Sequence, residues 1–147
     1  MKERTVAIGL KIPDNAAYTA LVTLRRLGVS VDRVERSEIW QLEDAHDASS
    51  LARRVERNET IFNPNKHRLT VLDRALPRAG EVWIGALGEG DEVREHLGGR
   101  GIEGVRSAQR YVGWRLFGND GSPVPRDVVG EAVERLLCNP AIERAIY

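Results

Sequence analysis

The sequence has 147 residues, and its 22 Lys and Arg balance 22 Asp and Glu, so its formal net charge is zero. That balance argues against a dedicated nucleic-acid-binding protein, which usually carries a basic excess. A single cysteine, Cys138, excludes an internal disulfide framework, and no apolar run reaches the roughly 18 residues that a membrane span needs. We therefore expect a soluble cytoplasmic protein that binds neither nucleic acid nor membrane.

The chain begins with a strand pattern followed by a helix pattern. Residues 4–12 alternate between two faces, which predicts a strand. A helix is then predicted from Pro13 or Asp14 to Gly28, because Asp is a favourable N-cap and Gly commonly follows the last turn. Its buried stripe is expected to consist of Ala17, Leu21, Leu24 and Leu27.

The next segment is extended and long. Over residues 29–43 the apolar positions change phase between Val31 and Val34, which indicates a bulge or two strands joined by a tight bend. Asp47 is then the expected cap of a second helix. A short strand over residues 67–72 completes this part of the chain.

The remaining sequence predicts the same order of elements. Strands over residues 82–87 and 104–118 flank a short helix over residues 91–97. A turn-rich segment leads into a helix over residues 126–137, and residues 139–147 follow it.

Three short matches in the same order indicate two copies of one unit. Residues 6–10 match 82–86, and Asn63-Pro64 matches Asn139-Pro140, both at one offset in the numbering, which we call the repeat offset. Residues 36–42 match 110–116 at nearly the same offset. The predicted organisation is a first repeat over residues 1–74, a linker over 75–79 and a second repeat over 80–147.

The size of the unit suggests why it is doubled. A domain of about 70 residues buries barely enough apolar surface to fold alone. We therefore expect an α+β fold of two sandwich units, each with helices on one face of a small sheet, packed together as a pseudo-dimer.

No group of residues has the spacing of a catalytic or metal site. His46, His67 and His96 lack the helical spacing that would direct two imidazoles at one ion, and Cys138 has no identifiable histidine partner. We therefore predict no catalytic residue, no cofactor and no metal.

Two charged groups in the first repeat are interpreted as surface features. Glu43 and Asp44 lie at a turn before a helix, where capping explains a negative charge. Arg53 and Arg54 are interleaved with acidic residues and are expected on a solvated helix face.

Four residues are the candidates for a partner interface or for the seam between the repeats. Trp40 and Trp114 occupy equivalent positions, and Arg36 and Arg110 lie four residues before them. Large aromatic residues usually fill a core or seam, which is the favoured interpretation. The alternative is a partner-binding surface, where Trp and Arg are over-represented.

The order of elements resembles that of a known family. Residues 6–43 and the C-terminal VERLLCNPAIERAIY (residues 133–147) resemble the small PurS subunit of phosphoribosylformylglycinamidine synthase, the glutamine-dependent ligase of purine biosynthesis. The resemblance covers most of the chain. It implies two tandem PurS-like, ferredoxin-like units, with the fused halves in place of the family's dimer.

The resemblance also implies a function. In that family the small subunit has no active site and joins the large ATP-using synthetase subunit to the glutaminase subunit, so that ammonia passes between their sites. We therefore expect a non-catalytic bridging subunit with those two partners, and further pairing of pseudo-dimers stays open. The alternative is a small-molecule-binding regulatory module of the α-β sandwich type, because fold alone does not decide function.

Overall fold

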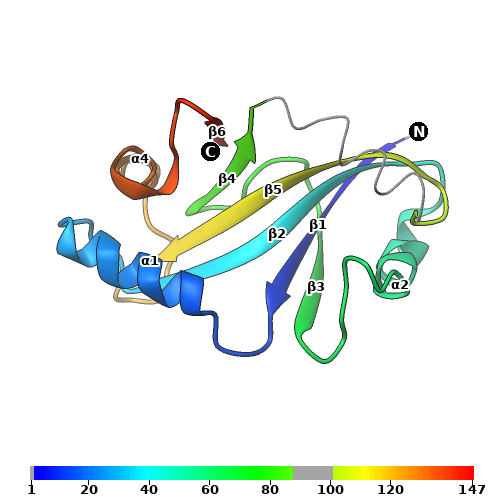
Figure 1. Cartoon of the computed structure of the whole chain (residues 1–147), viewed down its shortest axis with the longest axis horizontal. Coiled ribbons are helices and arrows are strands. Elements are labelled where there is room, and N and C mark those ends of the chain that lie inside the picture. The colour runs from blue at the N-terminus through cyan, green and yellow to red at the C-terminus, as the bar shows by residue number, and fades with distance from the viewer. Residues whose placement is uncertain (1, 88–100) are drawn as a thin grey trace. The chain divides into compact units, whose positions relative to one another are not determined.

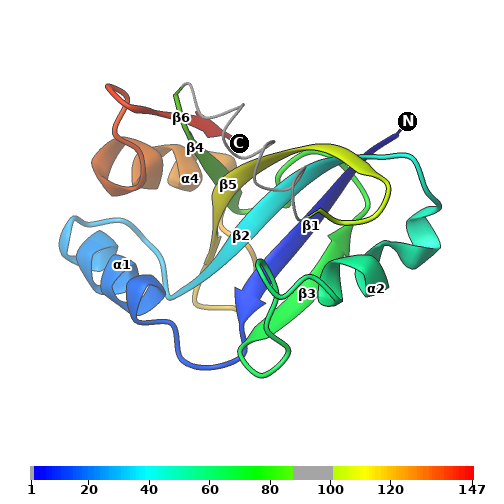
Figure 2. The ribbon, with the colours of Figure 1, turned by 45° about the vertical axis from the view of Figure 1, so that its right-hand side comes forward.

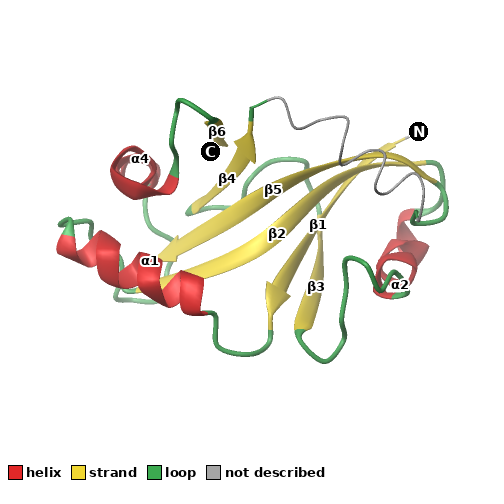
Figure 3. Ribbon diagram, in the orientation of Figure 1, coloured by secondary structure: helices red, strands yellow, loops and turns green. Residues whose placement is uncertain are grey.

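The computed structural model describes residues 2–87 and 101–147, and it confirms the predicted α+β class. The strands are β1 (Lys2–Leu10), β2 (Arg33–Asp44), β3 (His67–Leu72), β4 (Glu81–Ala86), β5 (Val105–Phe117) and β6 (Glu143–Ile146). The described α-helices are α1 (Asn15–Arg26), α2 (Leu51–Glu56) and α4 (Arg126–Ala132) (Figures 1 and 3). The helix expected over residues 91–97 lies outside the described residues.

The six strands are hydrogen-bonded in the order β3-β1-β2-β5-β4-β6. The ladders between β1 and β3, β4 and β5, and β4 and β6 are antiparallel. Among the described residues, no helix is both long and apolar enough to cross a bilayer.

The chain forms two compact units that interleave along the sequence. Within the described residues, unit 1 contains residues 2–12, 38–75 and 101–111, and unit 2 contains residues 13–37, 76–87 and 112–147. One boundary between the units falls within β2 and another falls within β5, so each unit contains part of both strands. Each unit therefore takes residues from the first and the second half of the sequence.

Unit 1 packs α2 on one face of its strands, beside β3 (Figure 2). Because side chains alternate along a strand, Val6 and Ile8 of β1 and Trp40 and Leu42 of β2 face the same core. The core consists of Val6, Ile8, Trp40, Leu42, Leu51, Val55, Ile61, Phe62, Ile102 and Ala108.

Unit 2 packs α1 and α4 against β4 and the end of β5. Its core consists of Leu24, Val29, Val31, Val82, Ile84, Leu116, Val124, Val129, Ala132 and Leu137. Each unit thus has its own apolar cluster under its helices, which is the arrangement that lets a small sheet bury one face.

Both predicted ends of α1 are confirmed. The Asp14 side chain accepts a hydrogen bond from the Ala17 N–H at 3.1 Å, and Gly28 follows the helix with a φ of +85°. The predicted stripe is wrong at Leu27, which is exposed because it is the C-cap residue and lies beyond the last helical turn. Ala20 is buried in the helix instead.

The long extended segment contains one continuous strand, so the predicted division into two strands is wrong. The phase change lies before β2 begins at Arg33, since Val29 and Val31 precede the strand. Within β2, Val34, Trp40 and Leu42 share one parity and pack in the two apolar clusters, whereas Ile39, on the opposite face of the strand, is also fully buried. A strand of regular alternation needs no bulge.

The predicted helix over residues 126–137 also differs in its last part. The α-helix ends at Ala132 and continues as a π-helical turn over Val133–Leu137, closed by a hydrogen bond of 3.2 Å from the Cys138 N–H to the Val133 carbonyl. A π turn is wider than an α turn.

The two Asn-Pro segments fold into turns with the same hydrogen bonds. In each turn the asparagine carbonyl accepts from the N–H groups three and four residues later, at 3.0 and 2.8 Å for Asn63 and at 3.1 and 2.8 Å for Asn139. The side-chain oxygen of each asparagine accepts from the N–H two residues later. The N–H of each asparagine donates, at 2.9 Å in both turns, to a side chain four residues later, which is His67 in the first turn and Glu143 in the second.

The strands that follow these turns pair in the same register. In the β1–β3 ladder Ile8 lies opposite Leu69, and in the β4–β6 ladder Ile84 lies opposite Ala145. The repeat offset carries each member of the first pair onto a member of the second. The sequence match at this offset therefore coincides with a match in backbone pairing.

Candidate functional site

A buried ion pair holds the end of β2 in unit 1. The side chains of Asp44 and Arg54 are 0% and 8% exposed. Arg54 donates from Nη1 to Oδ1 at 2.9 Å and from Nη2 to Oδ2 at 2.8 Å. This paired geometry is the strong form of an arginine–carboxylate contact.

The other hydrogen atoms of the Arg54 guanidinium are also engaged. Nε donates to the Ser50 hydroxyl at 2.9 Å, Nη1 donates to the Glu103 carbonyl at 2.7 Å, and Nη2 donates to the Asp47 carbonyl at 3.2 Å. Since an arginine offers five N–H donors in all, Arg54 has none left for a ligand. It positions the surrounding backbone.

The interpretation of Arg54 as a solvated side chain is therefore wrong. Asp44 does cap a turn, because its Oδ1 accepts a hydrogen bond from the His46 N–H at 3.0 Å, but its carboxylate is buried in the ion pair. Asp44 belongs to the same alternation as Trp40 and Leu42, which both face the core. Burial by itself raises the pKa of Asp44. Hydrogen bonds from Arg54 and from the His46 N–H, together with the charges of Arg54 and Arg4, outweigh that effect and lower the pKa.

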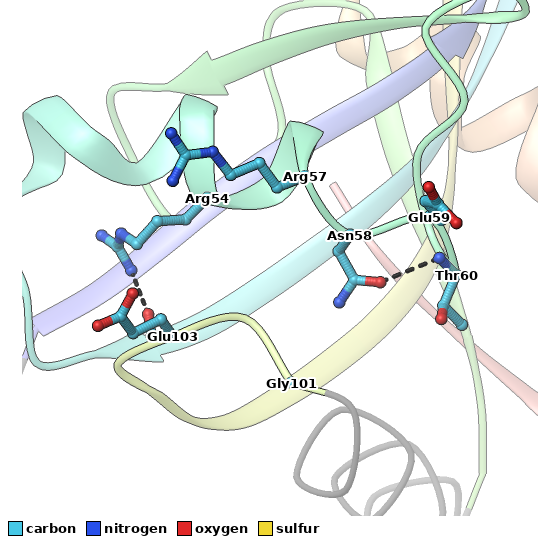
Figure 4. Close-up of a pocket in the computed structure, with 7 residues that line it drawn as sticks. All are labelled: Arg54, Arg57, Asn58, Glu59, Thr60, Gly101 and Glu103. Carbon is cyan, nitrogen blue, oxygen red and sulfur yellow. Dashed lines mark hydrogen bonds between the residues drawn. The ribbon is translucent and has the colours of Figure 1, made fainter.

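A cavity of about 370 Å³ lies beside this pair in unit 1 (Figure 4). Its lining residues are Arg54, Arg57, Asn58, Glu59, Thr60, Gly101 and Glu103. Arg54 extends toward Glu103, and the Asn58 side-chain oxygen accepts from the Thr60 N–H at 3.0 Å. The described lining offers charges of both signs and the Thr60 hydroxyl but contains no Cys, His or Lys.

The two equivalent tryptophans lie in different units. Trp40 is buried in the core of unit 1, and Trp114 is half-buried against the core of unit 2. Trp83, on β4 of unit 2, is fully buried. Trp40 and Trp83 are thus packed inside the protein, whereas Trp114 keeps part of its surface exposed.

The two equivalent arginines are also divided between the units, and each contacts a carboxylate. In unit 2 the Arg36 Nε lies 3.2 Å from the Asp14 Oδ2, so that Arg36 contacts the residue that caps α1. In unit 1 the Arg110 Nη1 lies 3.8 Å from the Glu38 Oε1. The structure thus places Arg36 with Trp114 in unit 2 and Arg110 with Trp40 in unit 1.

Unit 2 contains a cluster of arginines around an aromatic ring that sequence reasoning missed. The guanidinium carbon of Arg33 lies 3.8 Å from the Phe117 ring centroid, and that of Arg115 lies 5.1 Å from it. Such cation–ring contacts are attractive. Arg115 and Phe117 are close together on β5, but Arg33 lies on β2, and only the fold brings it over the ring.

The same cluster contains an ion pair. Arg78 donates to the buried Glu81, from Nη2 at 2.8 Å and from Nε at 3.2 Å. The Arg115 Nε, by contrast, donates to the backbone carbonyl of Ala79 at 3.5 Å. The pKa of Arg115 is lowered by its burial first and then by the charge of Arg78. Burial and the neighbouring Arg78 therefore both disfavour the charged form of the Arg115 guanidinium.

Within the described ranges, no group of three or more His, Cys, Asp or Glu side chains is placed to hold a metal ion. His67 lies 5.9 Å from the Phe62 ring, centroid to centroid, and His96 is outside the described residues. Burial, followed by the charge of Glu143, raises the pKa of the Cys138 thiol, which makes it a poor nucleophile at neutral pH.

No protein-family model and no curated protein matches this chain.

Proposed function

We propose that this chain is a tandem PurS-like protein, in which two ferredoxin-like sequence repeats, residues 1–74 and 80–147, pair as a pseudo-dimer. It would act as a non-catalytic bridging subunit of phosphoribosylformylglycinamidine synthase. Its partners would be the large synthetase subunit and the glutaminase subunit. The chain would help the two assemble, so that ammonia released by one reaches the other.

The observation that carries this proposal is the repetition of one hydrogen-bonded turn and one strand register at the repeat offset. Asn63 and Asn139 make equivalent bonds, and the strands after them pair equivalently with β1 and β4. The repetition supports a duplicated unit, and the C-terminal copy of the turn lies in the segment that resembles the family.

The chemistry of the described side chains is consistent with a role through protein contacts. Arg54 is committed to Asp44 and to backbone carbonyls, and the thiol of Cys138 is deactivated by its surroundings. Arg36 and Arg110 are partly exposed, and each contacts a carboxylate in its own unit. Partly exposed arginines can add contacts to a partner, since the guanidinium has five donors.

The test is reconstitution with the synthetase and glutaminase subunits of the same organism. Light scattering in the presence of glutamine and magnesium-ADP should give the mass of a ternary complex that forms only when this chain is added. Glutamine-dependent synthesis should rise with the complex, whereas synthesis from free ammonia should not change. Full glutamine-dependent activity without this chain would overturn the proposal.

Charge reversals locate the contact face. Arg36→Glu and Arg110→Glu should each weaken the complex if the arginines meet the partners. Arg26→Glu, at an exposed position of α1, makes the same change of charge as a matched control. Circular dichroism and thermal melting of each variant would separate loss of binding from loss of fold.

The cavity beside Asn58 gives the regulatory-module alternative a specific place in unit 1. Its volume is within the range of small-molecule sites, but such sites are mostly apolar, and this lining is charged and polar. A thermal-shift screen with amino acids and nucleotides distinguishes the two, because a ligand that binds only the folded state raises its melting temperature. A shift abolished by Thr60→Val would favour the regulatory module.

A further inference from the structure

We propose that β3 is a dimerisation strand, which pairs antiparallel with β3 of a second copy of this chain. This inference does not depend on the proposed function. It concerns unit 1, in which β3 is the outermost strand of the order β3-β1-β2-β5.

The register shows which backbone groups of β3 face outward. Leu10 lies opposite His67, and the next residue, Lys11, donates its N–H to the Lys66 carbonyl at 2.8 Å. In an antiparallel ladder, hydrogen-bonded pairs alternate with non-hydrogen-bonded pairs. The N–H and C=O groups of Leu69 and Val71 therefore point away from β1, at the free side of the strand.

The other outermost strand of the described sheet, β6, has its end covered. Arg126 donates from Nη2 to the Tyr147 carbonyl at 3.0 Å, and its guanidinium carbon lies 5.2 Å from the centroid of the Tyr147 ring. By the repeat offset, this carbonyl corresponds to that of Val71. A charged side chain over a strand edge is a common protection against pairing.

In the part of the chain that the structure describes, no charged side chain is hydrogen-bonded to the outward backbone groups of β3, although β3 carries the exposed Arg68. Val71 is 39% exposed, and no proline interrupts residues 67–72. Exposed apolar strands with open backbone groups are the surfaces on which sheets join. The edge strands β3 and β6 are equivalent in the repeat, but only β6 is covered by a bonded arginine. This difference indicates that β3 is the edge that pairs with a second copy.

If a two-fold axis passes through Thr70 and relates two antiparallel copies of β3, the facing side chains of the two copies are complementary. In that register Leu69 lies opposite Val71 of the second copy, and each such pair exchanges two backbone hydrogen bonds. Leu69 already packs against the core of unit 1, so the pairing extends an apolar surface. The exposed part of Val71 would be covered by the second copy.

If the pairing extends one residue beyond the end of β3 at Leu72, the same axis brings His67 opposite Asp73 of the second copy. The His67 Nδ1 accepts a hydrogen bond from the Asn63 N–H at 2.9 Å. The neutral ring must then carry its hydrogen on Nε2, where it can donate to a carboxylate. Apolar pairs near the axis and a donor–acceptor pair at each end favour a second copy as the occupant of this edge.

The first test is sedimentation velocity over a wide range of protein concentration. The wild type should approach twice the chain mass of 16.4 kDa as the concentration rises. Val71→Pro removes an outward N–H, keeps the β1–β3 hydrogen bonds, and should leave the protein monomeric. Ala145→Pro removes an outward N–H of β6 as a matched control and should leave the dimer unchanged.

The second test uses charge. His67→Glu should preserve the turn, because Glu143 makes the corresponding hydrogen bond in the second Asn-Pro turn. It places two carboxylates opposite each other at both ends of the interface and should raise the dimer dissociation constant about tenfold. Asp73→Lys in the His67→Glu background should restore dimerisation.

The proposal is overturned by a protein that stays monomeric at every concentration. It is equally overturned by a dimer whose dissociation constant neither Val71→Pro nor His67→Glu changes. Thermal melts of the monomeric species establish that each variant is folded. None of these outcomes depends on the synthetase or glutaminase, so failure here is distinguishable from failure of the bridging role.

Discussion

Arg54 holds Asp44 by two hydrogen bonds, of 2.9 and 2.8 Å, although ten residues separate the pair along the chain. The contact joins the end of β2 to α2, and a third bond from Arg54 fixes the carbonyl of Glu103 before β5. A buried ion pair is not by itself stabilising, since both charges lose their hydration. Removal of one partner, however, leaves the other charge uncompensated.

Asp44→Asn should therefore destabilise the protein by about 3–5 kcal/mol, because it strands the buried guanidinium of Arg54. Urea denaturation followed by circular dichroism would measure the loss. The control is Asp32→Asn, whose carboxylate lies 3.8 Å from Arg25 in an exposed pair. That change should cost under about 1 kcal/mol, and equal losses for the two variants would contradict the prediction.

The pH dependence of stability should contain a contribution from Asp44. Its folded-state pKa is lowered from the ordinary value of 3.8, so the folded protein binds its proton less readily than the unfolded chain. The stabilisation is complete above that ordinary value and is lost as the pH falls through the lower folded-state pKa. Urea melts at decreasing pH should show a steeper acid decline for the wild type than for Asp44→Asn, and parallel curves would contradict this assignment.

Gly104→Ala should be more destabilising than Gly28→Ala, although the two glycines have similar φ angles of +83° and +85°. A Cβ at position 104 would lie 2.1 Å from Cδ2 of His46, whereas nothing lies within 4 Å of one at position 28. Gly28→Ala should cost about 1 kcal/mol for its backbone conformation alone, and Gly104→Ala about 1–3 kcal/mol more.

Chemical denaturation of the two glycine variants provides the comparison. His46→Ala should recover much of the additional loss in a Gly104→Ala background, because it removes the side chain that clashes. Absence of any recovery would show that contact with His46 is not the reason for the glycine.

Asn63→Ala and Asn139→Ala should have matching effects. Each removes a side-chain oxygen that accepts the N–H two residues later, and each should cost about 1 kcal/mol. Thermal melting of both single variants measures the match. A neutral effect at one turn with a clear loss at the other would mean that the two turns, despite their common geometry, are not energetically equivalent.

Sequence reasoning succeeded where the backbone demands particular residues. The cap at Asp14 and the turn glycine at Gly28 were predicted because the side chain, or the lack of one, satisfies a local geometric need. Asp47, predicted to cap the second helix, caps instead the short 3-10 turn Ala48–Ser50 that leads into α2. The two Asn-Pro segments were matched in sequence but not predicted as turns, and in the structure each asparagine side chain accepts a hydrogen bond from the backbone two residues later. Local chemistry of this kind can be read without knowledge of the fold.

The rest depended on tertiary contacts. Alternation predicted that Trp40 and Leu42 are buried, but not that β2 serves two cores along its length. The burial of Asp44 was missed because a charged residue was expected to be exposed. The alternation that places Trp40 and Leu42 in the core also places Asp44 facing inward. Its partner Arg54 lies on another element, and no spacing in the sequence links the two.

The interleaving of the two units has a consequence for the chain as a polymer. The core of unit 1 includes Ile102 and Ala108, and the core of unit 2 includes Leu24, Val29 and Val31. A cut within residues 75–79 would thus yield two fragments, neither of which contains all the apolar residues of either core. Each fragment should be unstructured alone and should fold when the two are mixed. The two fragments could therefore serve as a split reporter, in which reassembly indicates that two proteins fused to the fragments have bound each other.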